Sequence, residues 1–364
     1  MNPNTRRLHD LGQRVWLDGT TREMLTSGRL AHCIADLGVT GLDWNPRMLE
    51  RAVATGRLYD DAIEMLDAAG LSEDALLLEL ILDDVTHAAD LLRPTFDATG
   101  GVDGWVAVEV APAGAHRARD AVKLARLVHG KAARPNVLVK VPGTADCMSA
   151  IEECVFDGVP IEVTLLLSRE HFVAASQAYV RALQRRMTAG LHLDVASIAS
   201  LEVNRWDLAV KEEISAPFHN RLGIAMAMRA YKAHNDLLAS QRWHRLATEG
   251  ARPQRLLWKG TACADPSARD TFYVEALAAP NTITAVVEKT LTAFAGHGQA
   301  GSVLPSDGGF ADAVLEEFRR EGVSDDALAT RLQGEAVENL VASWCTLLGS
   351  VREKTALVTA PDFP

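Results

Sequence analysis

One lysine of this sequence lies where a charged side chain is costly. Lys140 stands within Val137-Leu138-Val139-Lys140-Val141-Pro142, the apolar pattern of a buried parallel strand. An ammonium group among apolar side chains is unfavourable unless it is paired or loses its proton. Burial lowers the pKa of an amine, and a neutral amine attacks a carbonyl carbon to form an imine. The pattern predicts a nucleophilic lysine, although a strand-end lysine that reaches solvent or pairs with a carboxylate would give the same pattern.

Other polar residues lie in or just after β-rich segments. Asp18 is a candidate proton shuttle, but an aspartate before a helix is also a common N-cap. Glu109 fits a solvated charge at a sheet edge as well as a catalytic acid, and the hydroxyls of Thr164 and Ser200 commonly cap backbone groups. Taken together with Lys140, a proton-shuttling carboxylate and a Glu–Thr pair that holds water form the set that aldol chemistry through an imine requires.

Short β-rich segments recur along the chain, and most are separated by helical stretches of ten or more residues. Strands that alternate with helices in this way favour parallel pairing. The segments cover residues 15–17, 38–42, 105–110, 136–141, 161–165, 195–199, 255–258 and 281–285.

Eight such units predict a closed (β/α)8 barrel, an α/β fold, rather than an open doubly wound sheet. Neither GxGxxG nor GxxxxGK[ST], the glycine-rich turns typical of open nucleotide-binding sheets, occurs in the sequence. We expect one domain over residues 1–364, a long helix over 219–247, and a helical C-terminal extension over about 308–350 with breaks at Gly322 and Gly334.

In such a barrel the chemistry belongs at the carboxyl ends of the strands. We therefore expect one mouth to be ringed by polar residues that end or follow the strands. These are Asp18, Asp43, Asn45, Glu109, Lys140, Glu162, Thr164, Ser200 and Arg205. Arg205 has a second reading, as the partner of Asp207 or of a nearby glutamate.

The bulk composition limits the classes of partner. The formal net charge is −11, which argues against nucleic acid and anionic membranes but leaves phosphorylated metabolites possible. The five cysteines are scattered without CxxC spacing, which favours a reducing compartment over disulfides or a zinc site. The N-terminus is polar, and no apolar run approaches the ~20 residues that span a bilayer. We expect a cytoplasmic, soluble protein that acts on small molecules, as a monomer or a homodimer.

Over about residues 8–355 the chain resembles the transaldolases, especially the longer bacterial type. The matching segments are 11–18, Gly38-Val39-Thr40-Gly41, Asn45-Pro46, 137–142, 163–168, 195–200, 252–258 and 270–275. The resemblance implies a (β/α)8 barrel with flanking helices. It also implies a role in carbohydrate metabolism, in the pentose phosphate pathway.

The resemblance implies a role for each matching residue. Lys140 would form the Schiff base, Asp18 would be the acid/base at the carbon–carbon bond, and Glu109 and Thr164 would position the water of imine formation. No metal and no cofactor are implied, because the iminium is the electron sink.

The same resemblance implies three contacts with substrate. Asn45 and Ser200 lie where the family binds substrate hydroxyls, and Arg205 matches an arginine that binds the sugar phosphate.

Four departures from the family pattern fall at the expected pocket. Asp43-Trp44 replaces a usual Thr-Ser, Glu162 replaces an asparagine, and Glu202 replaces an apolar aromatic residue. In residues 258–266, where the family has Trp-Ala-Ser-Thr-x-Thr-Lys-Asn-Pro, Ala264 takes the place of a phosphate-binding cation. Three carboxylates are gained and one cation is lost. At ~4 Å and an effective dielectric constant near 20, one like-charge pair costs about 4 kcal/mol.

These changes suggest retained imine chemistry with a pocket re-tuned for a substrate that is non-phosphorylated or carries an amine. Random drift should also have altered Asp18, Glu109, Lys140 and Thr164, which are intact. Lys259 is not expected to replace the lost cation, because strand alternation puts it opposite Trp258 and Gly260.

Three alternatives remain open. The first is an ordinary pentose-phosphate transaldolase that acts on sedoheptulose 7-phosphate and glyceraldehyde 3-phosphate. The second is a metal-dependent barrel enzyme with Mg²⁺ held by Asp43, Glu109, Glu162 and Glu202. The third is a non-catalytic scaffold that kept the fold.

Overall fold

All eight predicted β-segments form strands, which close into a parallel barrel in chain order. The computed structural model describes residues 1–109, 111 and 117–360. The strands are β1 (Arg14–Asp18), β2 (Val39–Asp43), β3 (Trp105–Val108), β4 (Val137–Pro142), β5 (Ile161–Leu166), β6 (Ser197–Glu202), β7 (Arg255–Lys259) and β8 (Thr282–Val286). The predicted (β/α)8 barrel is confirmed.

Two strands, β3 and β6, differ from the expected bounds by more than one residue at an end. β6 begins at Ser197 rather than at residue 195 and continues to Glu202, which carries that side chain to the barrel mouth. β3 ends at Val108, and residue 110, the last of the predicted segment, lies outside the described residues.

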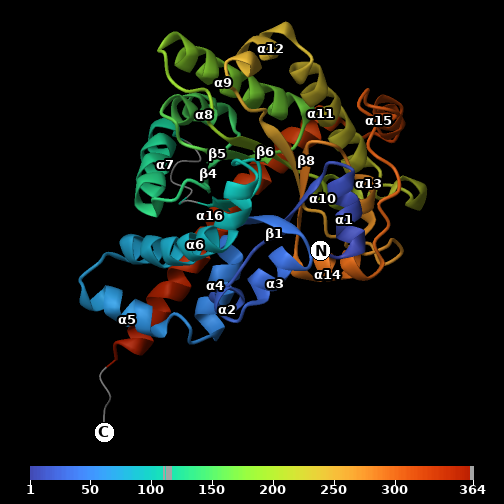
Figure 1. The fold of residues 1–364 in the computed structure, drawn as a ribbon. Coiled ribbons are helices and arrows are strands. Elements are labelled where there is room, and N and C mark those ends of the chain that lie inside the picture. Colours follow the sequence, from blue (N-terminus) through green and yellow to red (C-terminus); the bar gives the residue numbers. More distant parts are fainter. Residues whose placement is uncertain (110, 112–116, 361–364) are drawn as a thin grey trace.

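Helices surround the barrel, and Figure 1 shows them arranged around the central strands. They are α1 (Pro3–Asp10), α2 (Arg22–Thr26), α3 (Arg29–Ala35), α4 (Pro46–Thr55), α5 (Asp60–Ala68), α6 (Glu73–Ala98), α7 (Ala118–Ala132), α8 (Met148–Phe156), α9 (Arg169–Thr188), α10 (Asn204–Val210), α11 (Leu222–Leu238), α12 (Gln241–Thr248), α13 (Phe272–Ala276), α14 (Glu288–His297), α15 (Ala311–Arg320) and α16 (Asp325–Val358), with short 3₁₀ turns η2 (Ala145–Cys147) and η3 (Ala216–Phe218). Within the described residues, no helix combines the length and apolar character needed to traverse a bilayer.

Two expectations about helices were wrong. Segment 219–247 is not one helix, because Ser240 ends the first part and its hydroxyl accepts from the Trp243 backbone N–H as the N-cap of α12. Gly334 does not break the C-terminal segment, since α16 continues through it. One glycine inside a helix costs about 1 kcal/mol, which packing along a helix of this length can offset. The predicted break at Gly322, between α15 and α16, is confirmed, and this glycine has a φ of +88°.

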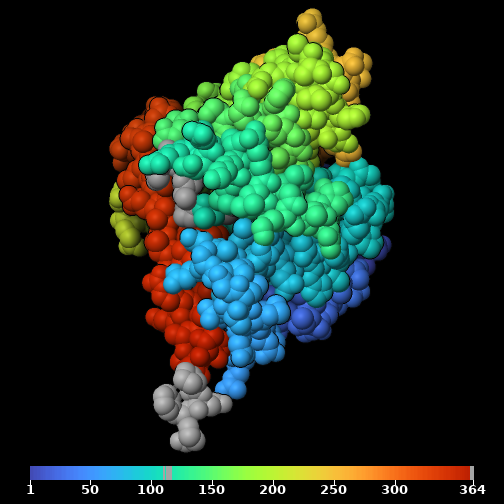
Figure 2. Space-filling view, turned by 90° about the vertical axis from the view of Figure 1, so that its left-hand side faces the viewer, coloured from blue at the N-terminus to red at the C-terminus, as the bar shows by residue number. Residues whose placement is uncertain are grey.

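Helix α16 also reaches the carboxyl end of the barrel. It packs against α4, α5 and α6, and in Figure 2 its red segment runs down one side of the molecule beside the light-blue part of the chain. At the other end Gln333 Nε2 donates to the carbonyl oxygens of Leu165, at 2.9 Å, and Gly143, at 3.1 Å. Ala336 and Val337 pack on Leu165. This helix therefore forms one wall above the strand ends.

Strand alternation divides the barrel interior into layers. The lower layer is apolar, and it contains Trp16, Trp105, Ala107, Leu138, Ile198, Leu257, Ile283 and Ala285. The Trp16 ring lies against Gly41, where a Cβ atom would overlap it. The next inward-facing residue of most strands, two positions later, is polar. The interior thus changes from apolar to charged toward the carboxyl ends of the strands.

The opposite mouth carries a buried ion-pair network. Asp103, which is almost fully buried, binds Arg14 Nε at 2.8 Å and Arg255 Nη1 at 3.0 Å. These residues begin or precede β1, β3 and β7, so one carboxylate joins three strands at their amino ends.

We predict that Asp103→Ala lowers the free energy of unfolding by about 3 kcal/mol, because removing one partner leaves buried charge uncompensated. Urea denaturation measures this. Asp194→Ala is the matched control: its salt bridge to Arg252 is more exposed, so the loss should stay below about 1 kcal/mol. Equal losses in the two variants would contradict the role of the network.

Candidate active site

Lys140 lies inside the barrel near the carboxyl end of β4. Its side chain is 1% exposed. Its Nζ donates to the Trp44 carbonyl oxygen at 2.6 Å, forms an ion pair with Asp43, and lies 3.7 Å from Glu109 Oε2. The partners come from the neighbouring strands β2 and β3 or from the residues that follow them. A fully buried amine is therefore held by two carboxylates and one carbonyl.

The protonation state of Lys140 differs from the expectation. Burial lowers the pKa of this amine, but the carboxylates of Asp43, Glu162 and Glu109 together outweigh burial and the charge of Lys259, and the pKa is raised above its usual value. The resting amine is therefore not neutral, and the alternative that the sequence pattern allowed, a lysine paired with a carboxylate, is the one observed. The resting group is an ammonium, and imine formation requires a base to remove a proton.

Lys259 also belongs to the site, contrary to the expectation. Alternation does place it opposite Trp258, but Trp258 packs in the outer core between strands and helices, whereas Leu257 and Lys259 face the barrel interior. Lys259 Nζ lies 2.6 Å from Asp43 Oδ2. Although burial disfavours its charge, nearby carboxylates led by Asp43 and Asp18 raise its pKa well above the ordinary value.

Asp43 thus lies between two lysines, with one carboxylate oxygen on each. Burial would raise its pKa, but Lys140 and Lys259 together lower it, so Asp43 is ionised. The side chain is fully buried.

Above this row lies a cavity of about 210 Å³ that opens at the carboxyl ends of the strands. Its wall brings together most of the predicted site residues, namely Asp18, Asn45, Glu109, Lys140, Thr164, Glu202 and Arg205. Asp43, Glu162 and Ser200 are buried below the wall. Sequence reasoning missed Lys259, Arg47 and the contribution of α16, which supplies Ala336, Asn339, Leu340 and Ser343.

Asp18 stands at the end of β1 on the cavity wall. Asn45 Nδ2 approaches its Oδ1 at 3.5 Å. Desolvation and the charge of Asp43 raise the pKa of Asp18, with Lys259 opposing them. The N-cap of α2 is Thr21, whose hydroxyl accepts from the Met24 backbone N–H, so the alternative reading of Asp18 as a helix cap was wrong.

Glu109 and Thr164 face the same space as Lys140. Burial raises the pKa of Glu109, and Lys140 and Lys259 partly oppose this rise. The Thr164 hydroxyl is deeply buried and has no hydrogen-bond partner within the described residues. Both groups are thus available to bond a molecule in the cavity.

Glu162 lies beside Lys140 in the register of β4 and β5, but its contact is with Ser200, whose hydroxyl donates to it. Burial, with the neighbouring charge of Asp43, raises the pKa of Glu162 to about 7. This glutamate is therefore partly protonated near neutral pH, and Asp43 is the direct partner of Lys140.

Arg205 follows β6 and lines the cavity. Its Nε lies 3.3 Å from Glu202 Oε2 at the end of the same strand. The partner is thus the nearby glutamate and not Asp207. Asp207 accepts from the backbone N–H groups of Leu222 and Gly223.

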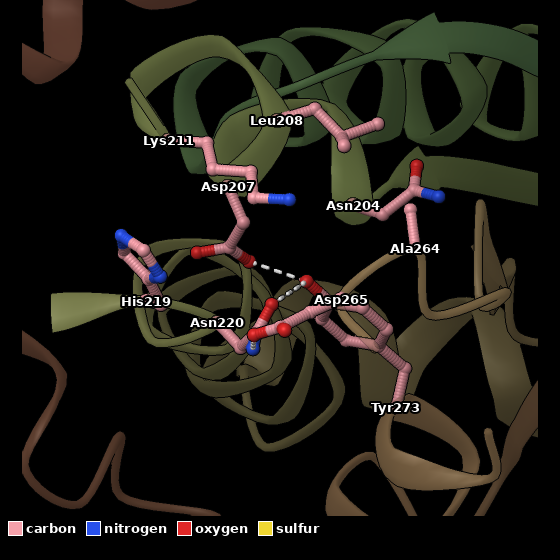
Figure 3. A pocket seen from close by; sticks show the side chains of 9 residues that line it. All are labelled: Asn204, Asp207, Leu208, Lys211, His219, Asn220, Ala264, Asp265 and Tyr273. Atoms are coloured by element: carbon pink, nitrogen blue, oxygen red, sulfur yellow. Dashed lines mark hydrogen bonds between the residues drawn. The ribbon is translucent and has the colours of Figure 1, made fainter. Parts of the chain in front are cut away.

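Ala264, the position of the missing cation, lies outside the cavity around Lys140. It lines a separate hollow of about 20 Å³, shown in Figure 3, with room for about one water molecule. Tyr273 Oη donates to Asp207 Oδ2 there at 2.8 Å, and burial raises the pKa of Asp207 to about 6. Asp265 and Lys211 also line the hollow. The enclosed part of the hollow is smaller than a phosphate group.

Each of the four carboxylates of the proposed magnesium cage has another partner, and Glu109 shares Lys140 with Asp43. Asp43 binds the two lysines, Glu162 binds Ser200, and Glu202 binds Arg205. Over residues 1–109, 111 and 117–360, no three His, Cys, Asp or Glu side chains form a group that could hold a metal ion. The arrangement does not form the predicted cage.

Comparison with known proteins agrees with this geometry. The model of the transaldolase/fructose-6-phosphate aldolase family matches residues 15–351. The chain belongs to this family. It is 36% identical to Transaldolase 1 of Streptomyces avermitilis, an alignment that covers 96% of this chain and 94% of the relative. It is 38% identical to a transaldolase of Thiobacillus denitrificans, covering 95% and 99%, and 35% identical to one of Thermobifida fusca, covering 99% and 100%. The resemblance to the longer bacterial transaldolases is confirmed, and the protein is an enzyme of the transaldolase family.

The raised pKa of Glu162 predicts a pH-dependent stability of this transaldolase-family enzyme. In the folded state Glu162 keeps its proton up to about pH 7, whereas in the unfolded state it loses the proton near pH 4.5. This difference stabilises the folded state fully below pH 4.5, and the stabilisation is lost as pH rises through 7. Glu162→Gln stays neutral. Relative to wild type, its free energy of unfolding should therefore improve by up to about 3 kcal/mol between about pH 5 and pH 8, measured in urea. The exposed Glu338→Gln is the control, and parallel pH profiles for wild type and Glu162→Gln would show the Glu162 carboxyl to be ionised throughout this pH range.

Proposed function

We propose that this enzyme makes or breaks a carbon–carbon bond of a sugar or sugar-like carbonyl compound through an imine on Lys140. The observation that carries the proposal is the buried amine at the base of a cavity whose wall also presents Asp18, Glu109 and Thr164. A nucleophile, a proton shuttle and groups that bond water are thus within one space, as imine chemistry requires.

The first step is deprotonation of the Lys140 ammonium. Glu109, 3.7 Å away, has a raised pKa and is a better base than an exposed glutamate. The free amine then adds to the carbonyl carbon, and the resulting carbinolamine loses its hydroxyl as water. Glu109 returns a proton to that hydroxyl, and the Thr164 hydroxyl positions the departing water. The products are the iminium and one water molecule, so atoms and charge balance.

The second step is cleavage of the bond between the α and β carbons of the iminium. Asp18 takes the proton of the hydroxyl on the β carbon, that carbon leaves as an aldehyde, and the electron pair of the broken bond passes into the iminium to give an enamine. The reverse sequence joins the enamine to an acceptor aldehyde. The raised pKa of Asp18 suits both proton removal and return near neutral pH.

We further propose that the pocket favours a neutral polyhydroxylated carbonyl substrate. A phosphate at Arg205 has to displace Glu202 from the guanidinium, and the enclosed part of the hollow beside Ala264 is too small to receive it. Lys259 adds a second cation to the cavity wall, which disfavours a substrate that carries an amine. Asn45 is suited to bond a substrate hydroxyl, and Ser200 and Glu162 support the wall from below.

A second candidate is the ordinary transaldolase reaction on sedoheptulose 7-phosphate and glyceraldehyde 3-phosphate. It is favoured by Arg205 on the cavity wall and by the names of the relatives. In this case Glu202 swings away when the phosphate binds. The two candidates share the imine and differ in how strongly phosphate contributes to kcat/KM.

Borohydride trapping tests the imine. We expect reduction in the presence of dihydroxyacetone or fructose 6-phosphate to leave a stable adduct on Lys140, identified by peptide mass spectrometry. Lys140→Met should give no adduct and lose turnover by at least about a thousandfold, because the covalent route is removed. Lys123→Met, an exposed change, should behave as wild type. Absence of an adduct on wild-type Lys140 with both donors, and with other ketoses and aldehydes, would contradict the imine and favour the non-catalytic scaffold.

Glu202→Gln tests the phosphate argument. Releasing Arg205 from its carboxylate should raise kcat/KM for fructose 6-phosphate about tenfold, a change of about 1.4 kcal/mol, and leave kcat/KM for unphosphorylated fructose unchanged. Arg205→Ala is the matched opposite and should lower only the activity on the phosphorylated donor. Efficient wild-type turnover of fructose 6-phosphate, with no gain in Glu202→Gln, identifies an ordinary transaldolase.

A further inference from the structure

An imine-forming site requires one lysine, but here two lysines, Lys140 and Lys259, flank the carboxylate of Asp43. We propose that Lys259 is a positioning residue that shares the Asp43 carboxylate with Lys140, so that the Lys140 ammonium gives up its proton at a lower pH than Asp43 alone would permit. This inference rests on the proposed function, since it concerns how the imine-forming amine is released.

The geometry divides one carboxylate between two cations. Asp43 Oδ1 pairs with Lys140 and Oδ2 with Lys259, the latter at 2.6 Å. The carboxylate is buried, so solvent does not weaken either contact. If Asp43 paired with Lys140 alone, the buried ion pair would stabilise the ammonium form of Lys140. A second cation on the other oxygen weakens the attraction between Asp43 and Lys140, and it also repels the charge of Lys140 directly.

The remaining charges determine which lysine loses its proton. Asp18 from β1, Glu109 after β3, Glu162 from β5 and Glu202 from β6 face this space, while Arg47 of α4 and Arg205 of α10 line the cavity above it. Among the described residues, the inward side chains of β8 are apolar.

Lys259 gains most from these carboxylates, because Asp18, Glu162 and Glu202 support its charge in addition to Asp43. For Lys140, the carboxylates of Asp43, Glu162 and Glu109 support the charge, but burial and Lys259 oppose it. Lys259 therefore remains the fixed cation, and Lys140 is the one that becomes a neutral nucleophile. Burial of Lys140, at 1% exposure, compared with 17% for Lys259, favours the same order.

The test is the pH dependence of imine formation in the intact protein. The rate of borohydride-trapped adduct on Lys140 is measured with dihydroxyacetone across the pH range for wild type, Lys259→Met and Lys259→Arg. We expect Lys259→Met to move the midpoint up by about one pH unit, which is about a tenfold slower rate below the midpoint. Lys259→Arg retains the cation and should keep the midpoint of the wild type.

Asp43→Asn is an independent test of the same inference, because it leaves Lys259 unchanged. It can replace Lys259→Met if that variant does not fold. Without the carboxylate between the two lysines, the midpoint should fall by about one unit or more. A merely structural ion pair between β2 and β7 would lower the unfolding temperature of these variants and leave the midpoint where it is. An unmoved midpoint in folded Lys259→Met, or in Asp43→Asn, overturns the inference.

The outcomes separate this inference from the proposed function. Absence of any adduct on wild-type Lys140 at every pH overturns both. An adduct on Lys140 with an unmoved midpoint leaves the imine intact and overturns only the role of Lys259. An adduct on Lys259 in place of Lys140 also overturns both. A midpoint that rises in Lys259→Met and falls in Asp43→Asn supports the inference.

Discussion

The buried contact of Asp43 with two lysines is the interaction on which the mouth of this barrel depends. Closing the barrel brings the ends of β2, β4 and β7 around one interior space, where charged groups are removed from water. Isolated ions there would be costly, so each must have a partner of opposite sign. Lys140 can remain buried as an ammonium because Asp43 is present, and Asp43 can remain ionised because Lys140 and Lys259 flank it. Lys140, Asp43 and Lys259 therefore form one group of coupled charges, and the charge of each depends on the other two.

The sequence predicted the fold well because strand length and strand spacing are local properties. It also predicted that Lys140 lies at the barrel mouth, since an apolar strand around a lysine leaves few other places. Lys259 was misplaced for a physical reason: alternation tells which residues share a face, but not which face is inside. Trp258 is apolar and large, and such a residue fits either the barrel interior or the layer beneath the helices. The contact between Asp43 and Lys259 joins strands far apart in sequence, and no local pattern reveals it.

Helix α16 shows a second limit of sequence reasoning. Its helical character follows from composition, but its path over the barrel depends on tertiary contacts, such as the hydrogen bonds from Gln333 to the carbonyl oxygens of Leu165 and Gly143. The same contacts explain why Gly334 does not interrupt it. Leu165 has a φ of +60°, a conformation that L residues rarely adopt, and here α16 packs directly on it. One wall of the cavity around Lys140 is therefore supplied by α16, about 200 residues after β4.

The charges gained in this pocket act through their partners rather than as a simple sum. Counted as isolated groups, Asp43, Glu162 and Glu202 would repel an anionic substrate uniformly. In the structure Asp43 is held between two lysines, Glu162 is partly protonated, and Glu202 occupies Arg205. The proposed obstacle to phosphate is therefore one contact, where a dianion has to compete with the Glu202 carboxylate already in place on the Arg205 guanidinium. On the proposed function, a neutral polyhydroxylated carbonyl compound meets no such competition, because it does not have to displace Glu202 from Arg205.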